Sequence, residues 1–310
     1  MAKHNARPLR TVLFVAGHDR NEIVNGYKSG ADSIVIDLEE PRAPFPEEER
    51  IKARAVVKKF LGNLPKVKKA PLIFSRVQPA STGQTLKDLR AVMGPNLAGV
   101  LVPKIESPAD VHAVDALLTC MEAEMGLEMG STMLYPIFET AQALRNAYDI
   151  GMASPRVSYM GGAISRFGDI HQAVGFRWTQ EGRETLFLRS KVLIDAKACG
   201  IRYPISGMWG GRLDDTEGLR AWCTELRNLG YYGMMIGDPL LIPTVHEVFS
   251  PTAEELAYWK RLDRLASKHK PGSGPIIDGD ANQGEAHIVH MAHVGSARKN
   301  LAWAKELGLA

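Results

Sequence analysis

Eight short apolar runs recur along the chain at similar intervals, and segments with helical character separate them. Runs of this length, in which polar and apolar residues do not alternate, are typical of parallel strands that are buried on both faces. Eight such strands alternating with helices predict an α/β fold, a (β/α)8 TIM barrel. The runs span residues 11–16, 33–38, 71–77, 99–105, 132–138, 157–160, 204–209 and 231–236.

Charged side chains stand at the ends of most of these runs. In a (β/α)8 barrel the carboxyl ends of all strands meet at one rim, and active sites are built there. Charges that are far apart in the sequence should therefore converge in space. They are Asp37, Glu39 and Glu40 after the second run, Arg76 in the third, Lys104 and Glu106 near the end of the fourth, Glu139 after the fifth and Asp238 after the eighth.

The length of 310 residues exceeds the roughly 250 that one barrel needs. A connector rich in Pro and Gly separates the last barrel helix from a final helix predicted at residues 286–307. We therefore predict a catalytic barrel over residues 1–268 and a C-terminal helical lid and oligomerisation segment over residues 269–310. The segment is too small to form a core of its own, so it must pack on a barrel. Within the barrel, residues 140–150 are predicted to form one helix.

Composition and charge argue against several classes of function. The formal net charge is only +3, and no dense Lys/Arg cluster alternates with aromatic residues, so no nucleic-acid partner is expected. The N-terminus lacks an apolar signal-peptide core, and no apolar stretch reaches the roughly 18 residues of a membrane span. Three cysteines without a CxxC spacing fit buried, reduced thiols. We therefore expect a cytoplasmic protein without a membrane partner.

Two carboxylates are candidates for a metal site. Glu139 directly follows an apolar run, and Asp169 lies in a glycine-rich loop after the sixth run. Neighbouring strand ends can bring the two to one hard cation, and Mg²⁺ typically takes one or two protein carboxylates and fills its other positions with water and substrate. The alternative is that both acids are solvated loop residues.

Two cations at the predicted rim have more than one possible role. Arg76 lies one residue inside the end of an apolar strand, where a guanidinium can grip a substrate carboxylate in bidentate fashion or pair with Glu39 or Glu40. Lys104 can serve as a Schiff-base lysine, but pairing with Glu106 or with the acids after the second run is the more ordinary role.

Several segments together resemble the citrate lyase β-subunit-like family of CoA-ester lyases. The matching segments follow the same order over nearly the whole chain, and their combination is specific although each alone is weak. They are residues 10–17 (RTVLFVAG), 29–32 (SGAD) running into 37–40 (DLEE), 103–107 (PKIES), 139–140 (ET), 168–169 (GD) with Gly175, and 247–251 (EVFSP).

The resemblance implies a (β/α)8 barrel that assembles as a homotrimer or homohexamer. It implies Mg²⁺ as cofactor, bound by Glu139 and Asp169, and a catalytic Arg76 that binds the substrate carboxylate. The family's acidic box falls on Asp37, Glu39 and Glu40, and Asp37 and Glu39 are expected to take part in catalysis. Arg10 and Lys104 are further expected substrate contacts. The implied partners are a 2-oxo acid and a CoA thioester.

The chain also departs from the family's pattern at several positions. Ala16 replaces a proline, Asn25 a lysine expected near the CoA phosphates, Gln78 an asparagine, and Asp238 a histidine. These changes do not touch the residues predicted to bind the metal and the 2-oxo acid. They weaken the resemblance at the residues expected to bind CoA.

The family's C-terminal acid/base falls on His290, which the lid segment of a neighbouring subunit would deliver. His287, His290 and His293 are spaced three apart, which favours a polar lid helix over a zinc site. Asp37 and Asp238 are the alternative acid/base candidates inside the barrel.

The sequence thus predicts a Mg²⁺-dependent carbon–carbon lyase that cleaves a hydroxyacyl-CoA by a retro-aldol or retro-Claisen step, or that works in reverse from a 2-oxo acid. One alternative is a metal-dependent aldolase that acts on a free hydroxy-oxo acid without CoA. Another is a non-catalytic barrel that binds a dicarboxylate. Titration with CoA separates the first two, and Mg²⁺-dependent binding of a 2-oxo acid tests the third.

Overall fold

The computed structural model describes residues 6–41, 45–162, 164–270, 274–279 and 287–310. The chain divides into two compact units, Met1–Phe249 and Ser250–Ala310, which are described separately below.

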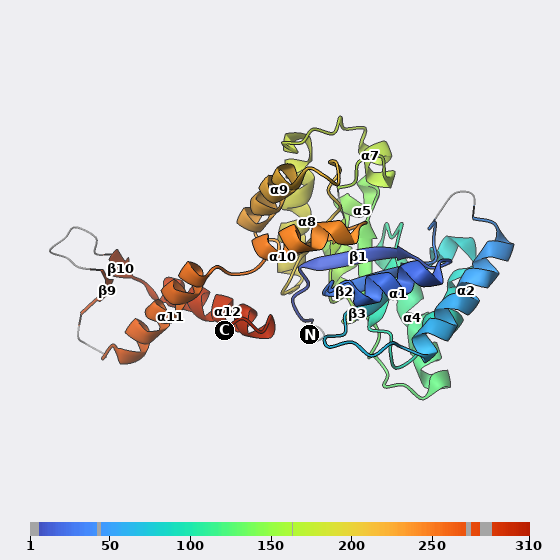
Figure 1. The fold of residues 1–310 in the computed structure, drawn as a ribbon, viewed down its shortest axis with the longest axis horizontal. Coiled ribbons are helices and arrows are strands. Elements are labelled where there is room, and N and C mark those ends of the chain that lie inside the picture. The colour runs from blue at the N-terminus through green and yellow to red at the C-terminus, as the bar shows by residue number, and fades with distance from the viewer. Residues whose placement is uncertain (1–5, 42–44, 163, 271–273, 280–286) are drawn as a thin grey trace. The chain divides into compact units, whose positions relative to one another are not determined.

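Eight parallel strands form the centre of the first unit, which confirms the predicted barrel fold (Figure 1). The sheet has the order β6-β5-β4-β3-β2-β1-β8-β7, so neighbours in the sequence are neighbours in the sheet except for β6 and β7, which form its two edges. The strands are β1 (Thr11–Ala16), β2 (Ser33–Asp37), β3 (Leu72–Arg76), β4 (Gly99–Val102), β5 (Met133–Phe138), β6 (Gly161–Gly162), β7 (Ile205–Ser206) and β8 (Gly233–Ile236).

The two edge strands β6 and β7 approach each other and nearly close the barrel. The Ile205 N–H donates to Met160 O (3.3 Å), and the Met208 N–H donates to Ile164 O (3.1 Å). A Cβ atom at Gly161 would lie 2.6 Å from Ile205 O, so the absence of a side chain there permits the approach.

The predicted position of the sixth strand is wrong by a few residues. Of the predicted run 157–160, Val157 forms only an isolated bridge to Leu134, and the ladder with β5 uses Gly161 and Gly162 instead. The sequence pattern could not reveal this strand because two glycines carry no apolar signal.

Helices and short 3₁₀ turns follow the strands, and α1 lies beside β1 and β2 (Figure 1). The predicted single helix at 140–150 is interrupted at Asn146, whose backbone (φ −96°, ψ 12°) leaves the helical conformation and whose side chain donates to Glu106 O (2.8 Å). The helices are α1 (Arg20–Lys28), α2 (Glu47–Gly62), α3 (Thr85–Val92), α4 (Pro108–Met125), α5 (Ala141–Arg145), α6 (Ala147–Met152), α7 (Asp169–Val174), α8 (Leu186–Ala198), α9 (Thr216–Leu229) and α10 (Ile242–Val248), with 3₁₀ turns η1 (Ala80–Thr82), η2 (Arg183–Thr185) and η3 (Pro239–Leu241).

The strands bury apolar side chains on both faces, as their sequence predicts. One cluster contains Val35, Phe74 and Ile137 together with residues of the other strands, and it fills the barrel. The alternate residues, such as Ile34 and Ile73, belong to the larger cluster that includes the helices. Side chains alternate between the two faces of a strand, so a residue two positions after an inward-facing residue also faces inward. The later residue lies nearer the carboxyl end of the strand.

This alternation selects three charged residues. Asp37, Arg76 and Glu139 follow Val35, Phe74 and Ile137 at a distance of two residues. The three residues therefore come from three different strands but meet on the inside of the barrel mouth.

The second unit consists of α11 (Ala253–Lys268), β9 (Ile276–Asp278), β10 (His287–Val289) and α12 (Met291–Glu306). It begins before α11 rather than at residue 269, because α11 packs on α12 through Trp259 and Trp303, whose ring centroids are 6.4 Å apart. The predicted final helix at 286–307 begins only at Met291, because residues 287–289 pair with β9 as an antiparallel strand.

Candidate functional site

A cavity of about 400 Å³ lies at the carboxyl end of the barrel strands. Residues from β3, from the segments after β2 and β5, and from the β6–α7 segment line it, so part of the predicted set of charges converges at this rim. Glu106 and Asp238, which belong to that set, are not among the lining residues. The charged residues that line the cavity, within the described part of the chain, are Glu39, Glu40, Arg76, Glu139 and Asp169.

The Arg76 guanidinium is surrounded by carboxylates. It donates from Nε to Asp37 Oδ1 (2.9 Å) and from Nη2 to Asp37 Oδ2 (2.7 Å), which makes a bidentate ion pair. Its Nη1 lies 2.9 Å from Glu39 Oε2 and 3.7 Å from Glu139 Oε1. Burial alone would lower the pKa of Arg76, but these carboxylates raise it, so the side chain stays cationic.

Glu139 is largely buried and only partly satisfied. Its Oε2 is buried without a hydrogen-bond partner among the described residues. Burial raises the pKa of Glu139 to about 7; Arg76 opposes the rise, while the nearby Glu39 and Asp169 charges add to it. A cation at this position would supply the missing partner and favour the carboxylate.

Asp169 is the second acid of the predicted metal pair. It is the first residue of α7, it lines the same cavity as Glu139, and 47% of its side chain is exposed. The described residues contain no group of three or more His, Cys, Asp or Glu side chains that could hold a metal ion. Two carboxylates, one of which has an orphaned oxygen, fit Mg²⁺, which keeps several waters, better than a closed zinc site.

Lys104 connects two of these acids. Its Nζ lies 3.2 Å from Glu39 Oε1 and 3.7 Å from Asp169 Oδ2, and its backbone adopts the left-handed conformation with φ of 54°. Partial burial would lower the pKa of Lys104, but Glu39 and Asp169 raise it. Because a Schiff-base lysine must be neutral to attack, this environment favours the ion-pair role over the Schiff base.

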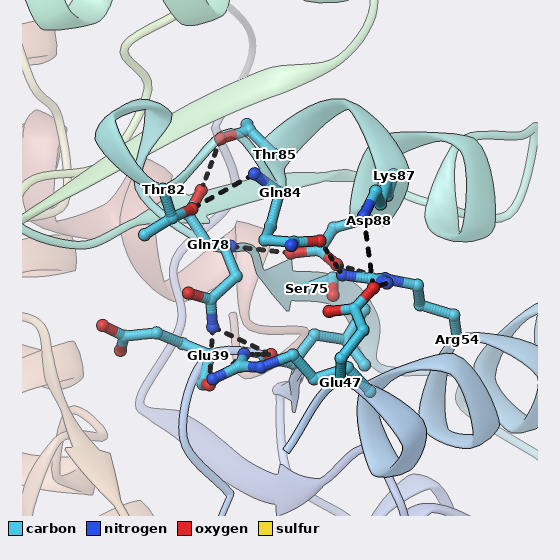
Figure 2. A network of polar contacts seen from close by, with 12 residues as sticks. Glu39, Glu47, Arg54, Ser75, Gln78, Thr82, Gln84, Thr85, Lys87 and Asp88 are labelled. Carbon is cyan, nitrogen blue, oxygen red and sulfur yellow. Dashed lines mark hydrogen bonds and ion pairs between the residues drawn. The ribbon is translucent and has the colours of Figure 1, made fainter. Parts of the chain in front are cut away.

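A polar network that the sequence did not reveal holds the backbone of Glu39 (Figure 2). The Gln78 side chain donates to Glu39 O (2.6 Å), and the Gln78 N–H donates to Asp88 Oδ2 (2.8 Å). Arg54 in turn donates from Nε to Asp88 Oδ1 (2.7 Å). Gln78 is one of the departures noted in the sequence, and here it joins the loops after β2 and β3.

Arg10, an expected substrate contact, lies at the opposite end of the barrel. It precedes β1 and forms a bidentate ion pair with Asp32, with Nε 2.8 Å from Oδ2 and Nη2 2.9 Å from Oδ1. Asp32 precedes β2, so both residues lie at the amino ends of their strands. This position argues against contact with a substrate in the cavity and indicates that Arg10 joins β1 to β2.

The acid/base candidates differ in their surroundings. His290 belongs to the second unit, where it is exposed and caps α12 together with His293. Only His293 lies within that helix, because His287 is in β10, so the expected helix carrying all three histidines does not form. Asp238 caps η3 and accepts the Leu240 N–H (2.8 Å). The surroundings of His290 and Asp238 do not test the predicted acid/base role of His290.

The three cysteines do not all match the expectation of buried thiols. Cys199 and Cys223 are buried, but Cys120 on α4 is exposed, and none of the three is in a disulfide. Among the described residues, no helix combines the length and apolar character needed to cross a membrane.

Comparison with known proteins identifies the family. The chain matches the HpcH/HpaI aldolase/citrate lyase family over residues 10–239. It therefore belongs to this family.

Two curated relatives cover most of the chain. The (3S)-malyl-CoA thioesterase of Cereibacter sphaeroides is 28% identical over 306 residues, which span 98% of this chain and 97% of the relative. A citrate lyase subunit beta-like protein of Deinococcus radiodurans is 30% identical over 275 residues, which span 87% and 91% of the two chains.

Solved structures share the fold. A citrate lyase from Burkholderia xenovorans superposes with a TM-score of 0.78 over 98% of this chain and 94% of that chain, at 16% identity. The CitE protein of Mycobacterium tuberculosis, in complex with magnesium, acetoacetate and coenzyme A, superposes with a TM-score of 0.69 over 97% and 99%, at 21% identity.

Proposed function

We propose that the protein is a Mg²⁺-dependent carbon–carbon lyase that cleaves a hydroxyacyl-CoA, or forms it from a 2-oxo acid. The observation that carries the proposal is the orphaned, largely buried Glu139 oxygen in a cavity that also contains Asp169 and Arg76. A buried carboxylate oxygen without a partner is costly, and a divalent cation that is shared with a substrate relieves this cost.

Each residue then has a defined task. Glu139 and Asp169 would hold the ion, which would supply Lewis-acid polarisation of the carbonyl oxygen of the 2-oxo acid. Asp37 occupies the Nε/Nη2 edge of Arg76 and so fixes the orientation of the guanidinium. The N–H groups of Arg76 that Asp37 does not use bind the 2-oxo-acid carboxylate, beside Glu39, whose Oε2 lies 2.9 Å from Nη1.

Use of a CoA thioester is supported by the relatives, one named a malyl-CoA thioesterase and one solved with coenzyme A. One observation favours the aldolase without CoA as a second candidate. Asn25, at a position where the resemblance to the family implies a lysine, is an exposed and neutral residue of α1 and offers no charge to a CoA phosphate. Arg76, Glu139 and Asp169 all line the cavity, and this argues against the non-catalytic barrel.

The remaining parts of the proposal concern the assembly. The C-terminal segment, residues 269–310, acts as a lid over the barrel of a neighbouring subunit in a homotrimer or homohexamer and excludes water from the enolate step. His290 on this segment is a candidate acid/base because an imidazole with a pKa near 6.5 can donate or accept a proton at neutral pH. Free cysteines fit a cytoplasmic location.

The test is calorimetric titration of the full-length protein with pyruvate, with and without Mg²⁺, followed by titration with CoA. The proposal predicts pyruvate binding only with Mg²⁺, and loss of this binding in Glu139→Gln. CoA binding supports the lyase that acts on a thioester. If CoA does not bind, the aldolase that acts on a free acid is the remaining candidate. Pyruvate binding that does not depend on Mg²⁺ would falsify the proposal.

A further inference from the structure

Glu39 lines the cavity, and the end of β3 holds it at both its carboxylate and its backbone. The Glu39 side chain is buried, with Oε2 2.9 Å from Arg76 Nη1 and Oε1 3.2 Å from Lys104 Nζ. Its backbone oxygen accepts a hydrogen bond from the Gln78 side chain (2.6 Å). Arg76 and Gln78 are only two residues apart, so one short segment contacts both ends of the same acid.

Gln78 is itself fixed in place. It is buried, its N–H donates to Asp88 Oδ2 (2.8 Å), and its backbone oxygen accepts from the Thr85 hydroxyl (2.8 Å). Asp88 is buried in turn and accepts from Arg54 Nε (2.7 Å). Figure 2 shows that the Gln78 side chain extends from this anchored backbone to Glu39.

A second donor also reaches the Glu39 backbone, but it comes from another element. Arg50 on α2 donates from Nη1 to Glu39 O (2.9 Å), and its guanidinium lies over the Phe45 ring at 4.9 Å. Arg50 therefore connects the loop after β2 to α2. Gln78 connects the same loop to the segment that carries Arg76, so it relates the acid to the guanidinium with which that acid pairs.

We infer that Gln78 is a positioning residue of the site, which acts through Glu39. By holding the Glu39 backbone it keeps the Glu39 carboxylate between Arg76 and Lys104, and this fixes the direction in which Arg76 meets a ligand carboxylate. Small displacements of binding groups weaken a site strongly, so residues that orient those groups matter without touching the ligand. The inference rests on the proposed function, because it is measured through binding of a 2-oxo acid.

A double-mutant cycle tests whether Gln78 acts through Glu39. Pyruvate is titrated at saturating Mg²⁺ into the full-length wild type, Gln78→Met, Glu39→Gln and the double variant. Methionine has a similar length but no donor, so Gln78→Met should weaken pyruvate binding at least about threefold. In the Glu39→Gln background no carboxylate remains to be positioned, and the same change should alter affinity by less than about 1.5-fold.

General damage to the fold would give a different result, because it would weaken binding by the same factor in both backgrounds. Gln78→Met should fold, since Arg50 still donates to Glu39 O and the carbonyl keeps a partner. If it does not fold, Gln78→Asn replaces it in the cycle, because this amide is one methylene shorter.

Asn96→Leu is the control for the loss of a hydrogen bond from a side-chain amide to a backbone carbonyl. Asn96 precedes β4 at the amino end of the barrel and donates to Leu61 O (2.9 Å). This variant should leave pyruvate affinity unchanged, and urea unfolding records the stability of every variant.

The outcomes separate the inference from the function on which it rests. Pyruvate affinity that is unchanged in Gln78→Met, or that falls by equal factors in the two backgrounds, overturns the inference and leaves the proposed function standing. If the wild type does not bind pyruvate in a Mg²⁺-dependent way, the proposed function itself fails, and the inference fails with it.

Discussion

At the scale of single residues, the site depends on which carboxylates pair with the Arg76 guanidinium. Arg76 is paired with Asp37 and Glu39, and its Nη1 lies 3.7 Å from a Glu139 oxygen, whereas the other Glu139 oxygen has no partner among the described residues. The three acids therefore do different things: Asp37 orients the cation, Glu39 links it to Lys104, and Glu139 keeps an oxygen for an ion.

Arg76→Lys tests this division. Lysine keeps the charge but loses the planar fork that Asp37 requires, so 2-oxo-acid binding should weaken at least tenfold, or about 1.4 kcal/mol, while Mg²⁺ affinity changes little. Calorimetry with each ligand checks this. Arg76→Ala should weaken 2-oxo-acid binding at least as much, but it leaves buried carboxylates unpaired and should cost about 3–5 kcal/mol of stability. Unchanged pyruvate affinity in Arg76→Lys would contradict the assigned role.

At the scale of elements, the closure between β6 and β7 is a tightly constrained part of the barrel. A Cβ atom at Gly207 would lie 2.3 Å from Ile164 O, so only glycine permits the observed approach. Ile164 and Met208, which form the hydrogen bond next to this contact, also line the cavity. Strand closure and cavity shape therefore depend on the same backbone.

Gly207→Ala should separate β6 from β7, lower the free energy of unfolding by about 1–3 kcal/mol, and weaken 2-oxo-acid binding. Gly62→Ala serves as the control, because nothing lies within 4 Å of a Cβ atom at this helical position, and alanine favours a helix by up to about 1 kcal/mol. Urea unfolding of both variants measures the free energy of unfolding and tests this prediction. Equal stabilities would show that the closure tolerates a side chain.

A second element-scale contact lies at the opposite end of the barrel. The His246 side chain on α10 lies 2.9 Å from Thr11 Oγ1 on β1, and burial lowers the pKa of His246 to about 4, with Asp32 opposing the shift. Although His246 Nε2 is 3.7 Å from Asp32 Oδ2, the contact is not a salt bridge at neutral pH because the imidazole is uncharged.

The stability of the barrel should therefore fall as the pH drops. In the unfolded chain this histidine takes up a proton near pH 6.5, whereas the folded protein resists protonation down to about pH 4. Its contribution is complete above pH 6.5 and is lost as pH falls toward 4, with a loss of about 3 kcal/mol. Urea unfolding at several pH values should show a shallower decline in His246→Gln than in the wild type; parallel curves would refute the assignment.

The sequence predicted those elements whose signal is local. Apolar runs located seven strands well, and the rule that the carboxyl ends of barrel strands meet at one rim placed Asp37, Arg76 and Glu139 together. The strand Gly161–Gly162 has no apolar signal, and the network of Gln78, Asp88 and Arg54 depends on loops that approach only in three dimensions. Arg10 was misassigned because a charged residue beside a strand does not reveal which end of the barrel it occupies.

At the scale of the whole molecule, the boundary between the two units matters for any truncation. A cut after residue 268 divides the second unit and leaves Trp259 without Trp303, whereas a cut after Phe249 removes the unit intact. Both truncations should abolish turnover and reduce the oligomer if the C-terminal segment is a lid. The shorter chain should stay more soluble and retain Mg²⁺-dependent binding of 2-oxo acids.

Turnover assays and gel filtration of these truncations, with full-length His290→Ala beside them, separate the lid from the histidine. Full activity in a truncated chain would exclude the lid. Full activity in His290→Ala alone would exclude the histidine and direct attention to Asp37 or Asp238 as the acid/base.

The most direct test of the central claim is a crystal structure of the full-length protein with Mg²⁺ and pyruvate. The account predicts one ion in the barrel mouth with oxygens of Glu139 and Asp169 at about 2.0–2.1 Å, and a pyruvate carboxylate within hydrogen-bond distance of Arg76. An ion bound elsewhere, or the two carboxylates pointing away from each other with pyruvate present, would contradict it.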